Sequence, residues 1–144
     1  MPDTIFSKII AGDIPCHRVH EDEHTLAFLD IGPLSRGHPL LIPKAPAETH
    51  AQLTDDAAAA IGRVLPRITR AVLAATGATA CNILQNNGPA AGQEVMHVHF
   101  HIIPTFDNHP EGTGLLMLLT PGTAPADAAD LASAPPHHSG HGPD

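Results

Sequence analysis

Apolar positions in the first third of the chain follow two different periods, which predicts both a helix and strands. Over residues 4–11 the apolar side chains recur at helical spacing, so a short helix is expected there, with Thr4 as its N-cap and Gly12 at its end. Apolar runs bounded by turn residues then predict three strands, over 17–21, 25–30 and 38–43. A polar turn separates the first two strands, which indicates an antiparallel hairpin.

One long helix is the clearest element of the pattern. Thr54 is its expected N-cap and Gly77 its C-terminal stop. Spacings of 3 and 4 residues predict one buried stripe, which consists of Ile61, Leu65, Ile68 and Val72. Pro66 lies inside this helix and is expected to kink it, because the proline ring removes one backbone hydrogen bond and collides with the preceding turn.

Two further strands, over residues 80–86 and 97–104, are predicted on either side of a loop rich in Asn and Gly. Five strands and two helices with short links indicate an α+β domain with a mostly antiparallel five-stranded sheet. We assign this domain to residues 1–106. Residues 107–144 are rich in Pro, Gly, Ala and His, and are expected to form a largely irregular or disordered extension with a weak helix near 126–133.

Composition limits the class of protein and of ligand. The length of 144 residues fits one domain, and a hydrophobic content of 42% is enough to build a core, although that core contains no Trp or Tyr. The formal net charge of −8, from 7 basic and 15 acidic residues, argues against binding long nucleic acids. It leaves room for a small anionic ligand held by backbone N–H groups and by some of the 12 histidines.

The sequence also suggests a location. Cys16 and Cys81 are far apart in the chain and fit a reducing compartment, with a single disulfide between them as the alternative. The N-terminal residues do not have the basic start and long apolar run of a signal peptide, and no segment approaches the ~20 apolar residues that span a bilayer. We therefore expect a soluble cytoplasmic protein that does not bind membranes.

The segment from His97 to His101 carries the most chemical information. Alternate side chains of a strand share a face, so His97, His99 and His101 should project together while the residues between them enter the core. Same-face neighbours lie about 6.6 Å apart, a spacing that suits imidazoles placed around one tetrahedral group. Each positive charge disfavours the next, so at least one imidazole should be neutral near pH 7 and able to act as a nucleophile.

Two other interpretations of these histidines remain open at this point. A histidine on a strand is most often a polar residue on a solvated face. Alternating histidines on a strand also hold zinc, with a further ligand or a water molecule completing the site. The spacing alone does not separate a metal site from a nucleophile.

The segment HVHFHII resembles the signature of the histidine triad family of nucleotide hydrolases and transferases. Asn86, Gly88, Gly92 and Gln93 precede it at the spacing of Hint-type members of that family. The similarity also includes segments 5–15 and 27–44 and the long helix, so it extends over residues 4–106. The residue at position 101 is histidine, as in the hydrolase branches of the family that this segment resembles, whereas the uridylyltransferase branch has Gln there.

This resemblance implies a covalent mechanism that needs no metal and no other cofactor. His99 would attack the α-phosphorus while a backbone carbonyl of its own strand holds its other ring nitrogen, and water would then release a nucleoside monophosphate. His97 and His101 would stabilise the phosphate oxygens, and Asp30 would bind the ribose hydroxyls. The base would lie in an apolar slot formed by Ile5, Phe6, Ile9, Phe28 and Ile31. The phosphate and leaving group would be lined by Asn86, Gly92 and Gln93.

Several of these residues also have a purely structural interpretation. Phe6, Ile9 and Phe28 could belong to the core, and Asp30 could cap the end of a strand. The loop residues Asn86, Gly88 and Gly92 could serve turns that need a positive φ.

The sequence departs from the family pattern at four positions. Thr4 and Ser7 stand where many relatives carry the Cys-x-x-Cys half of a zinc site, so that site is expected to be absent. Pro46 replaces a histidine found in many relatives. Glu94 stands where Hint-type members often have a Ser near the phosphate or leaving group, which leaves the leaving-group preference open.

The leading hypothesis is hydrolysis of purine nucleoside 5′-phosphoramidates or related nucleotidyl conjugates. The alternatives are a dinucleoside polyphosphate hydrolase, a nucleotide-binding or interaction protein with weak turnover, and a metal-dependent enzyme. The resemblance further implies a homodimer in which two five-stranded sheets join into one of ten strands, with the long helix or the strand before it at the interface.

Overall fold

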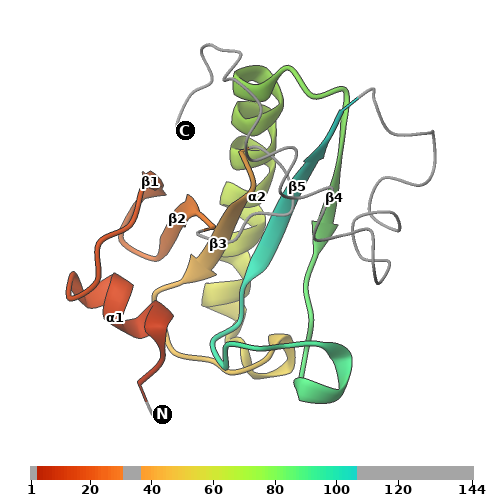
Figure 1. The fold of residues 1–144 in the computed structure, drawn as a ribbon. Coiled ribbons are helices and arrows are strands. Elements are labelled where there is room, and N and C mark those ends of the chain that lie inside the picture. Colours follow the sequence, from red (N-terminus) through yellow and green to blue (C-terminus); the bar gives the residue numbers. More distant parts are fainter. Residues whose placement is uncertain (1–2, 31–36, 107–144) are drawn as a thin grey trace.

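A five-stranded antiparallel sheet with one helix on each face forms the domain (Figure 1). The computed structural model describes residues 3–30 and 37–106. The helices are α1 (Ile5–Ala11) and α2 (Asp55–Thr76), and the strands are β1 (Arg18–Glu21), β2 (Thr25–Leu29), β3 (Pro39–Pro43), β4 (Ala80–Leu84) and β5 (Phe100–Thr105). The order β1-β2-β3-β5-β4 places β5 inside the sheet and β4 at its edge. The predicted α+β class with a five-stranded antiparallel sheet is confirmed.

The helix ends follow the capping residues of the sequence. Thr4 and Ser7 form a capping box, in which each side chain accepts a hydrogen bond from the backbone N–H of the other, and Gly12 ends α1 with a left-handed φ of 86°. Thr54 caps α2 and Gly77 ends it. All four predicted helix limits are confirmed.

Helix α2 buries a different set of side chains from the one predicted. Ile61, Ile68 and Val72 are buried as expected, but Val64 is buried where Leu65 was predicted, and Leu65 packs only at the border of the core. The buried stripe of α2 is centred on Val64 and Ile68, and position 65 falls on its flank. Helix α2 continues without interruption through Pro66.

Two apolar clusters lie on opposite faces of the sheet. The first packs α2 against the sheet, and its strand residues include Ala27, Leu41, Val98, Phe100 and Ile102. The second packs α1 against the other face and consists of Phe6, Ile9, Leu26, Phe28, Leu40 and Ile42. Adjacent strand residues therefore alternate between the two clusters, as the period of a strand requires.

The fifth strand begins three residues later than predicted, at Phe100 instead of residue 97. Its pairing with β3 includes only His101 with Leu40 and Phe100 with Leu41. The backbone hydrogen bonds between β3 and β5 do not continue before Phe100, because the groups there have other partners. The Val98 N–H donates to the Ala47 carbonyl, and the imidazole of His97 donates to the carbonyl of Pro43. The fourth strand also stops early, at Leu84 instead of residue 86, where the side chains of Gln85 and Asn87 bond to each other.

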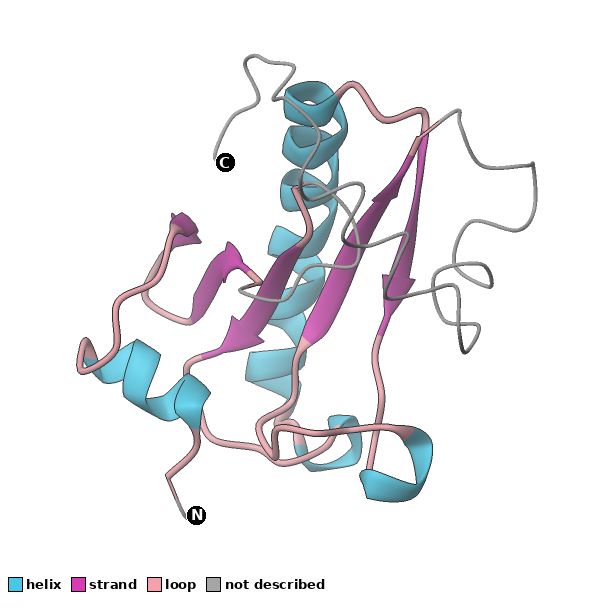
Figure 2. Cartoon of the chain, in the orientation of Figure 1, coloured by secondary structure: helices cyan, strands magenta, loops and turns pink. Residues whose placement is uncertain are grey.

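The loop after β3 and the loop before β5 meet at one end of the sheet (Figure 2). The Gln93 side chain donates to the Glu48 carbonyl at 2.6 Å, and the His50 N–H donates to the Asn87 side chain at 2.7 Å. These contacts fix the backbone that leads into β5.

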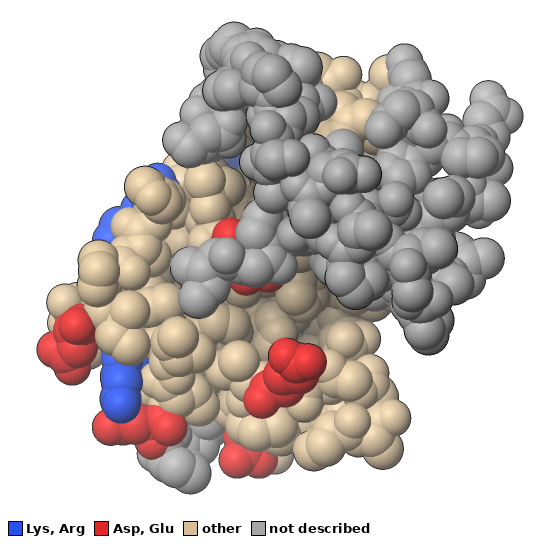
Figure 3. Space-filling model, in the orientation of Figure 1, with Lys and Arg blue, Asp and Glu red and all other residues tan. Residues whose placement is uncertain are grey.

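The predicted extension over residues 107–144, with its weak helix near 126–133, lies outside the described residues. No helix in the described ranges is long and apolar enough to cross a membrane. On the face seen in Figure 3, the described acidic side chains lie among mostly uncharged atoms, and basic side chains gather only toward one edge. That view shows no broad basic surface among the described atoms.

Candidate active site

The three histidines lie where the chain enters β5, on the face of the sheet that α1 covers. His101 pairs with Leu40, which belongs to the cluster under α1, whereas Val98 and Phe100 belong to the cluster under α2. His97 and His99 are 1% and 7% exposed, and His101 is half-buried. The rings of His99 and His101 lie 5.0 Å apart, and Phe6 of α1 stands edge-on to His99 at the same distance. The alternation predicted for this segment is therefore present, although its first three residues precede the strand.

A backbone carbonyl fixes the tautomer of His99. Its Nδ1 lies 2.7 Å from the carbonyl oxygen of His97, and an oxygen of this kind can only accept a hydrogen bond. The proton of the neutral ring is therefore on Nδ1, which leaves the lone pair on Nε2. A lone pair on an oriented Nε2 is the requirement for a nucleophilic imidazole.

His97 is oriented in the opposite sense. Its Nε2 donates to the carbonyl oxygen of Pro43 at 2.8 Å, so in the neutral ring the lone pair is on Nδ1. That Nδ1 is buried and has no hydrogen-bond partner among the described residues. A neutral His97 therefore has no remaining N–H for a ligand, and its clearest contact with the other histidines is the carbonyl that holds His99.

His101 belongs to a second histidine pair that the sequence did not reveal. Its Nδ1 lies 2.9 Å from Nε2 of His38, and the same Nε2 lies 3.9 Å from Oδ2 of Asp30. The carboxylate favours the proton on Nε2 of His38, so Nδ1 of His101 accepts and Nε2 of His101 carries the remaining proton. This arrangement turns an N–H of His101 outward from the pair.

Burial keeps these imidazoles uncharged near neutral pH. It lowers the pKa of His38 and that of His101 to about 4, against attraction from the Asp30 carboxylate. Burial also lowers the pKa of His97 and the pKa of His99, and the hydrogen bonds to the backbone carbonyls oppose that change only in part. The site thus combines one imidazole whose Nε2 has a free lone pair with one whose Nε2 carries a proton, which suits chemistry at a phosphate.

The chain is similar to known proteins of one family. Residues 11–108 match the protein family described as the HIT domain. The chain belongs to the HIT-domain family. It is 49% identical to Protein hit of Bacillus subtilis over 102 residues, which are 71% of this chain and 70% of that protein. It is 47% identical to the adenosine 5′-monophosphoramidase hnt1 of Schizosaccharomyces pombe over 111 residues, which are 77% of this chain and 80% of that protein.

Solved structures of the HIT family share the fold. The crystal structure of a HIT family protein from Bacillus anthracis superimposes with a TM-score of 0.71 at 46% sequence identity, covering 72% of this chain and 74% of that one. The predicted membership in the histidine triad family is confirmed.

The described residues that were predicted to form the base slot differ in exposure, because three are buried and one is exposed. Phe6, Ile9 and Phe28 are buried in the cluster under α1, and the rings of Phe6 and Phe28 contact each other edge-on at 5.5 Å. Ile5 is 39% exposed, and Ile31 lies outside the described residues. Phe6 touches both Phe28 and His99, so it joins the apolar cluster to the histidines.

The loop before the triad supplies Asn86, Gly92 and Gln93. Gly92 has a φ of 94°, which only glycine adopts readily, and a side chain there would meet the amide of Asn86. Gln93 is buried, and its side-chain amide donates to the carbonyls of Glu48 and Val95 and accepts from the Gly88 N–H. Both of its N–H groups are used within the protein, so the Gln93 side chain fixes the loop and keeps no donor for a ligand.

The departures from the family pattern are now placed in space. The hydroxyls of Thr4 and Ser7 form the capping box of α1. Pro46 and Glu94 are exposed loop residues. His38 is the residue that the sequence analysis missed, because a single histidine at the start of an apolar strand carries no period. The signal that could have found it is a polar side chain opening a segment whose other positions are all apolar.

Proposed function

We propose that this HIT domain hydrolyses nucleoside 5′-phosphoramidates or related nucleotidyl conjugates and releases a nucleoside monophosphate. The observation that carries the proposal is the hydrogen bond from Nδ1 of His99 to the His97 carbonyl, because it leaves the Nε2 lone pair ready to attack. The similarity to adenosine 5′-monophosphoramidases of two yeasts supports the choice of substrate.

The reaction proceeds in two displacements. Nε2 of His99 attacks the α-phosphorus, the bond from phosphorus to the leaving nitrogen breaks, that nitrogen takes a proton from solvent and departs as the amine, and a nucleotidyl group remains on His99. Water then attacks the same phosphorus, the bond to Nε2 breaks, the water gives up a proton to solvent, and the monophosphate leaves. The N–H on Nε2 of His101 stabilises the negative oxygens in both steps.

The remaining residues bind and orient the substrate. Asp30 accepts hydrogen bonds from the ribose hydroxyls, and the purine base packs on the cluster that contains Phe6, Ile9 and Phe28, beside the exposed Ile5. Ile31, outside the described residues, is assigned to the same base slot from the sequence alone. Asn86, Gly92 and Gln93 shape the loop beside the phosphate. His97 acts through His99 by holding it in one orientation.

The test compares turnover of adenosine 5′-phosphoramidate by the natural protein, by His99→Ala and by a matched control, His24→Ala, which removes an exposed histidine of another loop. We expect the control to keep full activity and His99→Ala to lose at least a thousandfold. Mass spectrometry of an acid-quenched reaction should show a nucleotidyl group on the natural protein and none on His99→Ala. Equal turnover by the two histidine variants would overturn the proposal. Faster release of the monophosphate from a dinucleoside polyphosphate would make that substrate class, and not phosphoramidates, the one that the protein hydrolyses.

A further inference from the structure

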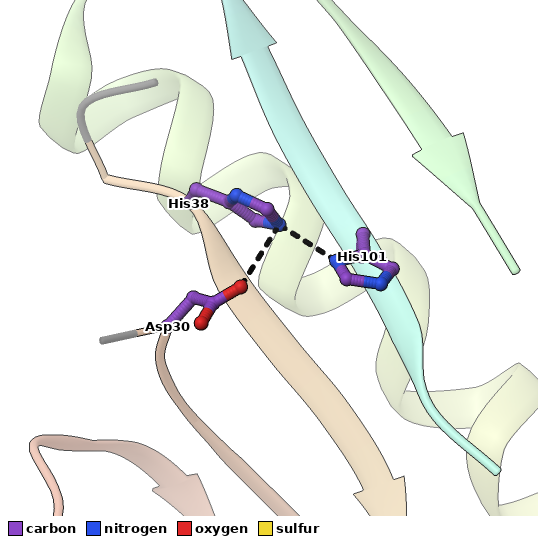
Figure 4. Close-up of side chains that lie close together, drawn as sticks. All are labelled: Asp30, His38 and His101. Carbon is purple, nitrogen blue, oxygen red and sulfur yellow. Dashed lines mark hydrogen bonds and ion pairs between the residues drawn. The ribbon is translucent and has the colours of Figure 1, made fainter. Parts of the chain in front are cut away.

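Three side chains from separate segments converge beside the triad: Asp30 after β2, His38 before β3, and His101 in β5 (Figure 4). One donor atom from each, a carboxylate oxygen and two imidazole nitrogens, lies within 4.8 Å of the other two. The two nitrogens are 2.9 Å apart, and Nε2 of His38 is 3.9 Å from Oδ2 of Asp30.

The backbone holds the three donors in place. The Asp30 N–H donates to the His38 carbonyl at 3.0 Å, which joins the chain on either side of the segment between β2 and β3. Leu40, two residues after His38, pairs with His101 across the sheet. The cluster therefore consists of one strand residue, His101, and two residues that directly flank β2 and β3 and are joined by a backbone hydrogen bond.

We propose that Asp30, His38 and His101 bind a divalent transition-metal ion of the Zn²⁺ type, and that this ion excludes the nucleotide. The metal site rests on geometry alone. The exclusion of the nucleotide rests on the proposed function, because it requires the Asp30 carboxylate to be the ribose ligand.

The distances suit such an ion. Tetrahedral zinc with bonds of about 2.0–2.1 Å keeps its ligand atoms about 3.3–3.4 Å apart. The separations of 2.9 and 3.9 Å from Nε2 of His38 lie on either side of that value, and the third pair of donor atoms, on His101 and Asp30, lies within 4.8 Å. Small movements of the three side chains therefore complete the site. Two imidazoles and one carboxylate form a ligand set of zinc and other late transition metals, whereas magnesium and calcium prefer oxygen ligands.

The protonation of the cluster also favours a metal ion. Imidazole binds a metal only in its neutral form, and burial keeps both His38 and His101 neutral at pH 7. Binding moves the proton of His38 from Nε2 to Nδ1, so the charge of the two rings does not change. Three protein ligands leave a fourth position for water, and the Asp30 side chain is 21% exposed.

The first experiment measures metal binding without any nucleotide. The tail histidines His137, His138 and His141 are replaced by Ala, because they offer a second metal-binding segment. Co²⁺, whose visible absorption reports four-coordinate binding, and Zn²⁺ in calorimetry are the probes. We expect one ion per chain, with an affinity that falls at least tenfold in Asp30→Asn and in His38→Gln. His24→Gln is the control and should bind as tightly as the parent.

Binding that is unchanged in both site variants would overturn the proposal. Asp30→Asn keeps the test decisive if His38→Gln unfolds, because Asp30 is partly exposed and its replacement is isosteric. Circular dichroism identifies an unfolded variant.

The second experiment separates the metal site from the enzymatic proposal. Increasing Zn²⁺ should raise the KM for adenosine 5′-phosphoramidate and leave kcat at saturating substrate unchanged, and adenosine monophosphate should weaken Zn²⁺ binding. One bound ion without any hydrolysis would overturn the proposed function and leave the metal site intact. One bound ion with independent nucleotide binding would overturn the exclusion alone.

Discussion

At the scale of single residues, the site depends on which nitrogen of each imidazole carries the proton. His99 and His101 have opposite arrangements because one faces a carbonyl and the other faces a second histidine. A carbonyl always accepts, whereas a histidine accepts or donates according to its own surroundings. The residue that decides the role of His101 is therefore His38, which the proposed reaction never touches directly.

Replacing His38 tests this positioning role. His38→Ala removes the donor to Nδ1 of His101, so the proton can occupy either nitrogen of His101, and we expect kcat to fall about tenfold to a hundredfold. His38→Gln places an amide N–H near the former Nε2 and should restore most of kcat. Steady-state kinetics of both variants provide the measurement. A Gln variant as slow as the Ala variant, with both folded, would contradict a role through hydrogen bonding.

The pH dependence of activity follows from the burial of His99. Because burial lowers the pKa of His99, the ring stays neutral below the value of about 6.5 that is usual for histidine. We expect kcat/KM to remain level from pH 8 through pH 6.5 and to decline only at more acidic pH. A kcat/KM profile for adenosine 5′-phosphoramidate, measured with buffers of constant ionic strength, provides the check. A decline centred at or above pH 6.5 would show that His99 titrates as an exposed histidine.

At the scale of elements, the short helix α1 is held by its cap and in turn places Phe6 against His99. Thr4→Ala removes the hydroxyl that accepts from the Ser7 N–H, which should lower the free energy of unfolding by about 1 kcal/mol. It should also raise KM, because Phe6 is less firmly placed between Phe28 and His99. The measurements are urea denaturation and steady-state kinetics.

Thr54→Ala is the matched control for that helix prediction. It removes the equivalent cap from α2, far along the chain from Phe6, and should cost similar stability without changing KM. An equal rise in KM in both variants would indicate that general loosening, and not the position of α1, is responsible.

The elements show what the sequence could and could not predict. Both helices were predicted with their caps, because Thr and Gly act locally at helix ends. The start of β5 was wrong by three residues, because the competing acceptors, the carbonyls of Ala47 and Pro43, come from another segment and leave no local pattern. His38 was missed for the same reason: its importance lies in its contact with His101, which is 63 residues away in the sequence.

At the scale of the whole molecule, three buried histidines and the half-buried His101 make folding sensitive to acid. Burial lowers the pKa of His38 to about 4, whereas in the unfolded chain it lies near 6.5. Between these values the unfolded state binds more protons than the folded state, so the free energy of unfolding decreases as the pH falls from 6.5 to 4. For His38 alone the loss across that window is about 3 kcal/mol.

Denaturation with urea at pH 7, 6 and 5 measures this effect. His38→Gln should lose less stability on acidification than the natural protein, because one buried titratable group is gone. His24→Gln, which removes an exposed histidine, should match the natural protein. Identical pH dependence in all three proteins would show that His38 does not contribute.

The homodimer prediction put the long helix or the strand before it at the interface, but β3, the strand before α2, lies inside the sheet between β2 and β5. Two sheets join at their edges, so we now propose the edge strand β4 for the interface. Its partner in the sheet is β5, its other edge is unpaired among the described residues, and Ile83 is 45% exposed on it. An exposed strand edge of this kind pairs readily with a second copy. Ile83→Lys should therefore shift the mass measured by light scattering from dimer toward monomer. A monomeric natural protein would contradict the prediction.

In the loop beside the triad, Gln93 holds the backbone in place, whereas the residue after it does not. All three hydrogen bonds of the Gln93 amide go to backbone groups of Glu48, Gly88 and Val95, so replacing it disturbs three segments at once. Glu94, the next residue, has an exposed side chain and does not hold these three segments together. The residue at position 94 can therefore change while the hydrogen bonds that hold the loop stay in place. Under the proposed function, this makes position 94 the place where a single substitution would alter leaving-group preference without moving the imidazoles.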